Sequence, residues 1–198
     1  MSVLVAAPLR DKDPWFQRWI SCYEALTYPK KKCCLASESA AARSYVHDHW
    51  PHVEVLAFDV WHPLFSSERI YAIAQARECI RRYVCEDPQV QWLLFIDIDI
   101  NFPTDTIERM LGLAQKGYDV VFSRLPGLIS LIHRDVAASV CFCTGVNTRN
   151  PCSTLEENYQ VERQIEVYNS VRPNQPFFRI QQFEAKWLQH KDKPVGQY

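Results

Sequence analysis

Three features that would place a protein in a class are missing from this sequence: a long apolar run, an excess of one charge, and a zinc-type cysteine spacing. No stretch of the 198 residues is apolar over the length needed to cross a bilayer, and residues 1–8 lack the basic flank of a secretion signal. The formal net charge of -1 supplies no general field for nucleic acid. We therefore predict a cytoplasmic protein with no transmembrane segment and no nucleic-acid partner.

The cysteines follow no CxxC or Cys/His zinc-finger spacing, although there are eight of them: Cys22, Cys33, Cys34, Cys79, Cys85, Cys141, Cys143 and Cys152. A chain of this length without an export signal favours reduced cytosolic thiols over disulfides. A zinc site assembled from Cys33, Cys34, Cys141, Cys143 and Cys152 remains an alternative interpretation.

Short apolar runs alternate with amphipathic stretches along most of the chain. Strands are expected at 2–7, 33–36, 53–58, 91–96, 118–122, 127–132 and 177–180, and helices at 13–27, 40–49, 67–84, 103–116, 134–140 and 155–168. This alternation predicts βαβ units, which build a mostly parallel central sheet with flanking helices. At this length, one α/β domain covering 1–198 is the expectation.

The stretch from Gln91 to Pro103 is the one around which the chain is organised. A buried apolar run ends at Ile96 and gives way to Asp97-Ile98-Asp99-Ile100-Asn101. In extended backbone the two carboxylates would project to one side, at the carboxyl end of a central strand, where open α/β sheets bind ligands. A divalent cation would remove the repulsion between them. The alternatives are solvated acids on an edge strand, or an Asp99 that caps the following helix.

Arg77 lies on the apolar stripe of the helix expected at 67–84, four residues after Ile73 and three before Ile80. An arginine in this position faces inward. Its guanidinium then reaches a bound phosphate or one of the central acids, or it extends past the margin of the stripe into water.

Four segments resemble the GT-A class of nucleotide-sugar-dependent glycosyltransferases, which is Rossmann-like: residues 3–10, 35–39, 69–83 and 95–103. The resemblance covers about 2–140. It implies a metal-dependent transferase of the hexosyltransferase type, which moves a sugar from a UDP- or GDP-linked donor to a hydroxyl of a glycan or another acceptor. By this resemblance, residues 1–102 form the nucleotide-binding part and 103–198 the acceptor part.

The resemblance also implies residue roles. Pro8, Arg10, Ser37, Glu38, Arg77, Asp97 and Ile98 would bind the nucleotide; Asp97, Asp99 and His190 would hold Mn²⁺ or Mg²⁺; and Asp97, Asp99 and Arg77 would be catalytic. Trp61, Phe65 or Trp187 would stack on an acceptor sugar, or belong to the core.

The sequence departs from that class in its catalytic base. No Glu-Asp pair is present downstream; Glu156-Glu157 is a loose substitute, and Asp135 is another acid in the region, so inversion or retention stays open.

A sugar-nucleotide nucleotidyltransferase is a rival, although residues 8–11 lack the glycine of its phosphate loop. The other rival is a non-enzymatic α/β interaction module with a structural metal. The oligomeric state is open.

Overall fold

The computed structural model describes residues 1–59, 68–123, 129–142, 156–171 and 178–190, and of residues 68–71, 156–160 and 189–190 it describes the backbone alone. The strands are β1 (Val3–Pro8), β2 (Lys31–Ser37), β3 (Glu54–Ala57), β4 (Trp92–Ile96), β5 (Ile100–Asn101), β6 (Val120–Ser123), β7 (Ile129–His133), β8 (Ile180–Phe183) and β9 (Gln189–His190). The helices are α1 (Phe16–Glu24), α2 (Ala40–His49), α3 (Glu68–Glu86), α4 (Thr106–Ala114), α5 (Arg134–Ser139) and α6 (Glu156–Val171). Among the described residues, no helix is both long and apolar enough to cross a membrane.

The central sheet has seven strands in the order β3-β2-β1-β4-β7-β6-β8. All neighbouring pairs are parallel except those of β7, which is antiparallel to β4 and to β6. The reversal follows from chain length, because only residues 124–128 separate β6 from β7 and a parallel crossover needs about a dozen residues. The prediction of a mostly parallel α/β sheet is confirmed.

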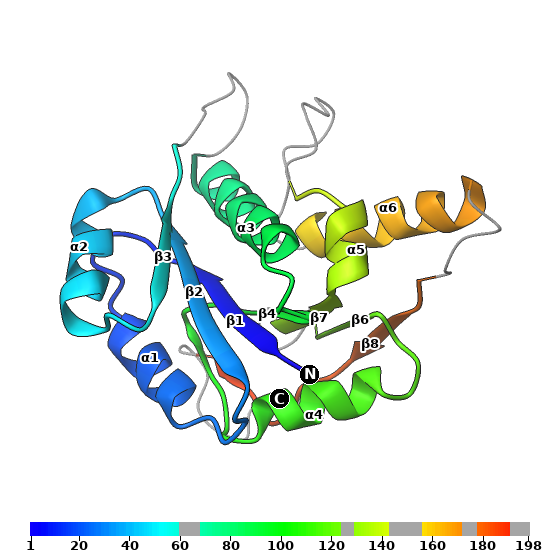
Figure 1. The fold of residues 1–198 in the computed structure, drawn as a ribbon, viewed down its shortest axis with the longest axis horizontal. Coiled ribbons are helices and arrows are strands. Elements are labelled where there is room, and N and C mark those ends of the chain that lie inside the picture. Colours follow the sequence, from blue (N-terminus) through cyan, green and yellow to red (C-terminus); the bar gives the residue numbers. More distant parts are fainter. Residues whose placement is uncertain (60–67, 124–128, 143–155, 172–177, 191–198) are drawn as a thin grey trace.

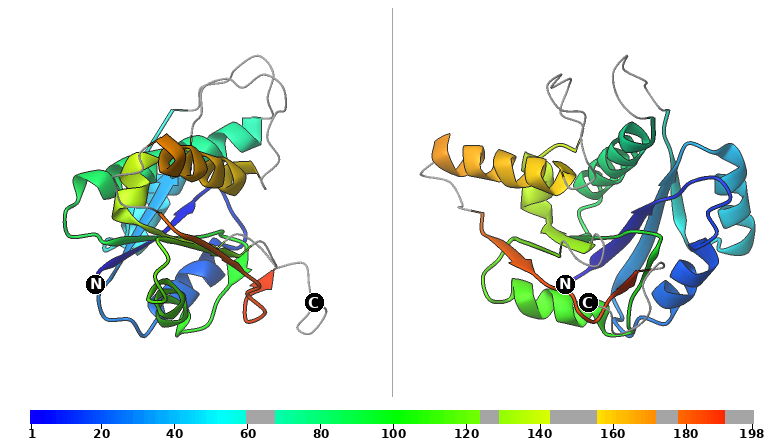
Figure 2. Two further views of the ribbon diagram at one scale, coloured as in Figure 1. Left: turned by 90° about the vertical axis from the view of Figure 1, so that its right-hand side faces the viewer. Right: turned by 180° about the vertical axis from the view of Figure 1, so that it is seen from behind.

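The helices cover both faces of this sheet (Figures 1 and 2). Helices α1, α2 and α4 pack on one face, and α3, α5 and α6 pack on the other. Strand β1 shows why two apolar layers are needed: Val3 and Val5 point to the first layer, whereas Leu4 and Ala6 point to the second. Within the part of the chain that the structure describes, helices therefore cover both faces of the sheet, which leaves its edges as the places for a ligand to approach.

Two helix starts differ from the sequence prediction. Helix α1 begins at Phe16 rather than at Pro14, after a turn in which the Asp13 carboxylate accepts a hydrogen bond from the Trp15 amide at 3.0 Å. Helix α4 begins at Thr106 rather than at residue 103. Asp105 makes no side-chain cap and pairs instead with Arg109 at 2.8 Å, one helical turn along the surface.

Candidate functional site at the carboxyl edge of the sheet

The carboxyl ends of the neighbouring parallel strands β2, β1 and β4 meet at one edge of the sheet. The register aligns Pro8 with Ala36 and Ala6 with Phe95, so Ser37 and Asp97 each lie just beyond the partners of β1. In open α/β folds the ligand crevice lies outside this edge. The segments that the sequence analysis selected in β1, β2 and β4 therefore converge on one place.

The acids after β4 lie in a turn and not in an extended strand. Ile96 is the last residue of β4, and the amide of Ile100 donates to the carbonyl of Asp97 at 3.0 Å, which closes a turn over 97–100. The extended backbone expected for Asp97-Ile98-Asp99 is therefore wrong, whereas the alternation of partly exposed acids and buried isoleucines holds. We call residues 97–100 the acidic turn. Asp97 and Asp99 are both partly exposed there, whereas Ile98 is buried.

Arg77 lies beneath the acidic turn and forms an ion pair with its first residue. The guanidinium Nη2 donates to Asp97 Oδ1 at 2.8 Å, and the guanidinium also lies over the ring of Phe95 at 5.7 Å. The side chain of Arg77 is buried, which confirms that it faces inward. Burial lowers the pKa of Arg77, and the charge of Asp97 acts in the opposite direction. Of the two inward roles, the structure shows the contact with a central acid.

A C-terminal segment reaches the same edge. β9 pairs antiparallel with β5, which places His190 opposite Ile100, the last residue of the acidic turn. The preceding chain is anchored where the amide of Ala185 donates to the hydroxyl of Ser123 at 3.1 Å. The backbone of His190 is therefore next to the acids, as a metal ligand requires, while its side chain lies outside the described residues.

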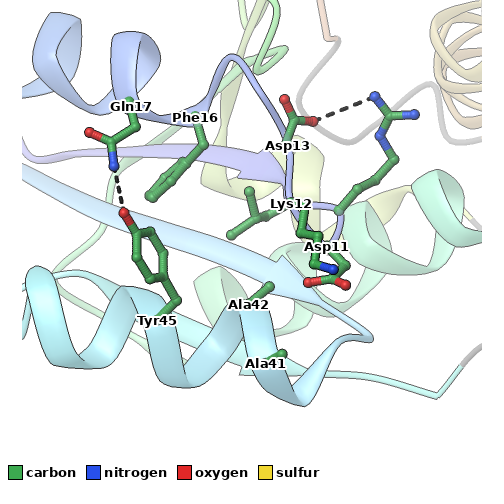
Figure 3. Close-up of a pocket in the computed structure, with 10 residues that line it drawn as sticks. Asp11, Lys12, Asp13, Phe16, Gln17, Ala41, Ala42 and Tyr45 are labelled. Carbon is green, nitrogen blue, oxygen red and sulfur yellow. Dashed lines mark hydrogen bonds and ion pairs between the residues drawn. The ribbon is translucent and has the colours of Figure 1, made fainter.

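A pocket of about 380 Å³ opens at the exit of β1, between α1 and α2 (Figure 3). Its apolar lining includes Phe16, and its polar lining includes Arg10 and Asp11. In Figure 3 the amide of Gln17 donates to the hydroxyl of Tyr45 across one side, at 2.5 Å. The other lining residues are Leu9, Lys12, Asp13, Ala41 and Ala42. The pocket has the size and the mixed lining of a small-molecule site.

The loop that borders this pocket is held in an uncommon backbone conformation. Lys12 has a φ of 51°, in the left-handed region that residues other than glycine seldom adopt. Arg10 pairs with Asp13 across it at 3.5 Å. Such conformations persist only where the surroundings impose them, and they gather at binding sites.

The exit of β2 is built mainly by backbone contacts. Ser37 is fully buried, and its hydroxyl accepts from the amide of Ser39 at 3.2 Å, while Arg43 donates to the carbonyls of Ser37 and Glu38. The side chain of Glu38 is exposed at this edge. Of this pair, Glu38 is thus the one whose side chain is open to a ligand.

Several residues that were candidates from sequence do not join the site. Asp135 does not lie at this edge: it is the second residue of α5, and the preceding His133 pairs with Trp92 at the opposite end of β4. The antiparallel direction of β7 carries it there. Trp187 is half-buried between the ring of Phe183 and the guanidinium of Arg109, which favours a role in packing.

Other candidates lie wholly or partly outside the described residues. Trp61 and Phe65 fall within 60–67. Glu156 and Glu157 start α6, and the structure describes only their backbone.

A buried polar cluster on α3 was missed by the sequence analysis. The carboxylate of Glu78 accepts from Arg81 at 2.7 and 2.8 Å and from the amide of Phe142 at 3.1 Å, and the ring of Phe142 meets Phe95 edge-on at 5.4 Å. Desolvation raises the pKa of Glu78, but the hydrogen bonds that it accepts, led by those from Arg81, outweigh this and leave the pKa lowered. An i, i+3 acid–arginine pair was the available signal, but it is common on helix surfaces.

The described residues contain no cluster of three or more His, Cys, Asp or Glu side chains that could hold a metal ion. Cys33 and Cys34 cannot serve one zinc ion together, because they belong to the apolar layers on opposite faces of the sheet. Burial raises the pKa of both thiols. These two cysteines are therefore unreactive core residues.

No protein-family model matches the chain, and no curated protein matches it in sequence. Among solved structures, it is similar to the mannosyltransferase PcManGT from Pyrobaculum calidifontis in complex with GDP-Man and Mn²⁺, with a TM-score of 0.58 and 11% identity over 92% of this chain and 55% of that one. It is also similar to a provisionally assigned nucleotide-diphospho-sugar transferase from Desulfovibrio desulfuricans G20, with a TM-score of 0.53 and 12% identity over 93% of this chain and 80% of that one. The chain thus spans about half the length of the mannosyltransferase, and these likenesses establish the fold alone.

Proposed function

We propose that this chain, which has a GT-A-like fold, is a glycosyltransferase that moves a sugar from a nucleoside diphosphate sugar to an acceptor hydroxyl. One observation carries the proposal: the exits of β1 and β2, the acidic turn and β9 meet at the carboxyl edge of the sheet. The similar mannosyltransferase structure contains GDP-Man and Mn²⁺, which supports a nucleotide-sugar donor and a metal ion.

The residues of the acidic turn fit a hard divalent cation that also binds a diphosphate. Mg²⁺ and Mn²⁺ take one or two protein carboxylates and complete their coordination with phosphate oxygens and water. Asp97 and Asp99 would supply the carboxylates, and His190 would be a further ligand from β9. A metal bound there would stabilise the negative charge that builds on the diphosphate as the glycosyl bond breaks.

The other residues at this edge would bind and orient the donor. The pocket at the exit of β1 would take the nucleoside, and Arg10 and Lys12 on its rim would add positive charge near the phosphates. Pro8, Glu38 and the turn of Ser37 would border the ribose.

Arg77 would act on the donor through Asp97, whose carboxylate it already holds. Glu156 and Glu157, in the first turn of α6, are the remaining candidates for the base that takes the proton of the acceptor hydroxyl.

A binding experiment tests the metal step. Mn²⁺ is titrated into the wild-type chain while tryptophan fluorescence is followed, with and without UDP or GDP. We expect the nucleotide to bind more tightly when Mn²⁺ is present, and Asp99→Asn to lose this gain. Asp135→Asn is the matched control, because it removes an exposed acid at the opposite edge. Nucleotide binding that ignores the metal in the wild type would contradict the proposal.

A product assay separates the transferase from its enzymatic rival. UDP- and GDP-linked sugars are incubated with the chain and Mn²⁺, with water or an added glycan as the acceptor of the sugar, and release of the nucleoside diphosphate is measured. A nucleotidyltransferase would instead release pyrophosphate from a nucleoside triphosphate and a sugar 1-phosphate. If neither product forms and no nucleotide binds, the non-enzymatic interaction module is the better description.

A further inference from the structure

Trp19, on α1, contacts the chain on both sides of the acidic turn. Its indole Nε1 donates a hydrogen bond to the carbonyl oxygen of Ile96 at 3.1 Å, and Ile96 is the residue immediately before the turn. Its ring meets the ring of Phe102 edge-on, with centroids 5.9 Å apart, and Phe102 directly follows β5. One side chain therefore contacts both ends of the segment 97–101.

The surroundings of Trp19 make it a rigid anchor. The side chain is fully buried, and the ring of Tyr23 lies nearly parallel to it at 6.3 Å. Because the indole is fully buried and its N–H is hydrogen-bonded, close packing holds the side chain in one conformation. Its two contacts therefore act as fixed points for the backbone from which the acids project.

The anchor bears on the acids because neither belongs to a regular element. Asp97 and Asp99 lie between the end of β4 and the start of β5, and β5 has only two residues. Turn residues owe their geometry to what holds their ends, and metal sites are sensitive to shifts of a fraction of an ångström in their ligands.

We infer that Trp19 is a positioning residue for the metal site: by holding Ile96 and Phe102 it fixes the acidic turn in the geometry that allows Asp97 and Asp99 to serve one cation. The inference rests on the proposed function for the cation, but the effect of Trp19 on the turn does not. Loss of a residue that supports metal ligands from outside typically weakens metal affinity about 10- to 100-fold.

Trp19→Phe and Trp92→Phe make a matched pair of variants. Both remove an indole that packs on the same apolar layer, and Trp92 lies at the opposite end of β4, where it packs against His133. Mn²⁺ affinity in the presence of GDP or UDP is measured from free Mn²⁺ by electron paramagnetic resonance. We expect Trp19→Phe to weaken Mn²⁺ binding by at least about tenfold and Trp92→Phe to leave it within about twofold.

A second measurement on the metal-free protein makes the outcomes distinguishable. Hydrogen–deuterium exchange of the peptide covering 97–102 should be faster in Trp19→Phe than in Trp92→Phe, because the turn has lost its anchor. If the wild type binds Mn²⁺ and Trp19→Phe binds it equally well, the inference is overturned and the proposed function stands. If the wild type binds no Mn²⁺, the metal site and the proposed function both fail. If the hydrogen–deuterium exchange of 97–102 is also unchanged in Trp19→Phe, Trp19 does not hold the turn either.

A third variant covers the case in which Trp19→Phe does not fold, which circular dichroism would show. Phe102→Leu removes the ring contact at the far end of the turn and keeps the hydrogen bond to Ile96. It should also weaken Mn²⁺ binding more than Trp92→Phe does. Equal affinity in Phe102→Leu and Trp92→Phe would count against the inference.

Discussion

The ion pair between Arg77 and Asp97 predicts an asymmetric response to mutation. The two side chains meet at 2.8 Å, but only 4% of the Arg77 side chain is exposed, against 32% of the Asp97 side chain. Asp97→Asn therefore removes a negative charge that lies 2.8 Å from a buried guanidinium. Arg77→Met leaves a carboxylate that keeps much of its contact with water.

The free energies of unfolding follow from this difference in burial. Breaking a buried pair costs about 3–5 kcal/mol when the remaining charge is fully desolvated, so Asp97→Asn should cost about 3 kcal/mol. Arg77→Met should cost about 1–2 kcal/mol, since the remaining acid is partly hydrated. The double variant should be more stable than Asp97→Asn alone, because it removes the buried guanidinium together with its countercharge.

Urea unfolding of the wild type, both single variants and the double variant measures these differences as a double-mutant cycle. Arg163→Met is a suitable control, because its ion pair with Glu166 on α6 is exposed and should contribute less than about 1 kcal/mol. If Arg77→Met is as destabilising as Asp97→Asn, or if the double variant is the least stable of the four, the burial argument is refuted.

Two further predictions concern stability away from the acidic turn. Gly117→Ala should destabilise the fold by about 1 kcal/mol or more, because Gly117 follows α4 with a φ of 94°. Gly112→Ala should stabilise the fold by about 0.5–1 kcal/mol, because Gly112 lies inside α4 with open space around it. The melting temperatures of the two variants should therefore move in opposite directions from that of the wild type. The pKa of the Glu78 carboxyl is lower in the folded protein than its ordinary value of 4.5. The ionised carboxyl therefore stabilises the fold fully above pH 4.5, and this stabilisation is lost as the pH falls through the lower pKa of the folded state. The difference in unfolding free energy between wild type and Glu78→Gln should therefore be largest near neutral pH and shrink in acid, and an unchanged difference at pH 3 would contradict the lowered pKa of Glu78.

The sequence was sufficient for the sheet because its signals are local. Strands β1, β2 and β4 each contain a short apolar run, and the helices show apolar stripes, so the alternation could be followed without knowing what packs where. Strand β8 is the exception: its sequence is Ile-Gln-Gln-Phe, and it overlaps the strand expected at 177–180 only at Ile180. The inward direction of Arg77 could be predicted in the same way. Its partner could not, because the same stripe position would serve a phosphate or an acid equally well.

The parts that the sequence did not reveal depend on contacts between distant residues. The antiparallel direction of β7 places Asp135 at the edge of the sheet opposite the acidic turn. The apolar pattern of a strand is the same in either direction, so the sequence could not show this. The pocket between α1 and α2 depends on the packing of these two helices, where Gln17 donates a hydrogen bond to Tyr45. The apolar stripes of the two helices do not indicate this contact.

The acidic turn shows why an Asp-x-Asp sequence alone is weak evidence for a metal site. A segment with this motif can form an extended strand or a turn, and here three distant elements contact the acidic turn or the residues next to it: α1 through Trp19, α3 through Arg77, and β9 through its pairing with β5. Each contact fixes a different part, namely the start of the turn, the first carboxylate, and the residue that ends the turn. A chain with the same motif and without these three contacts would present the same acids in no defined geometry. For the proposed metal site, we therefore expect the side chains and the strand that hold the acids to matter as much as the spacing of the acids.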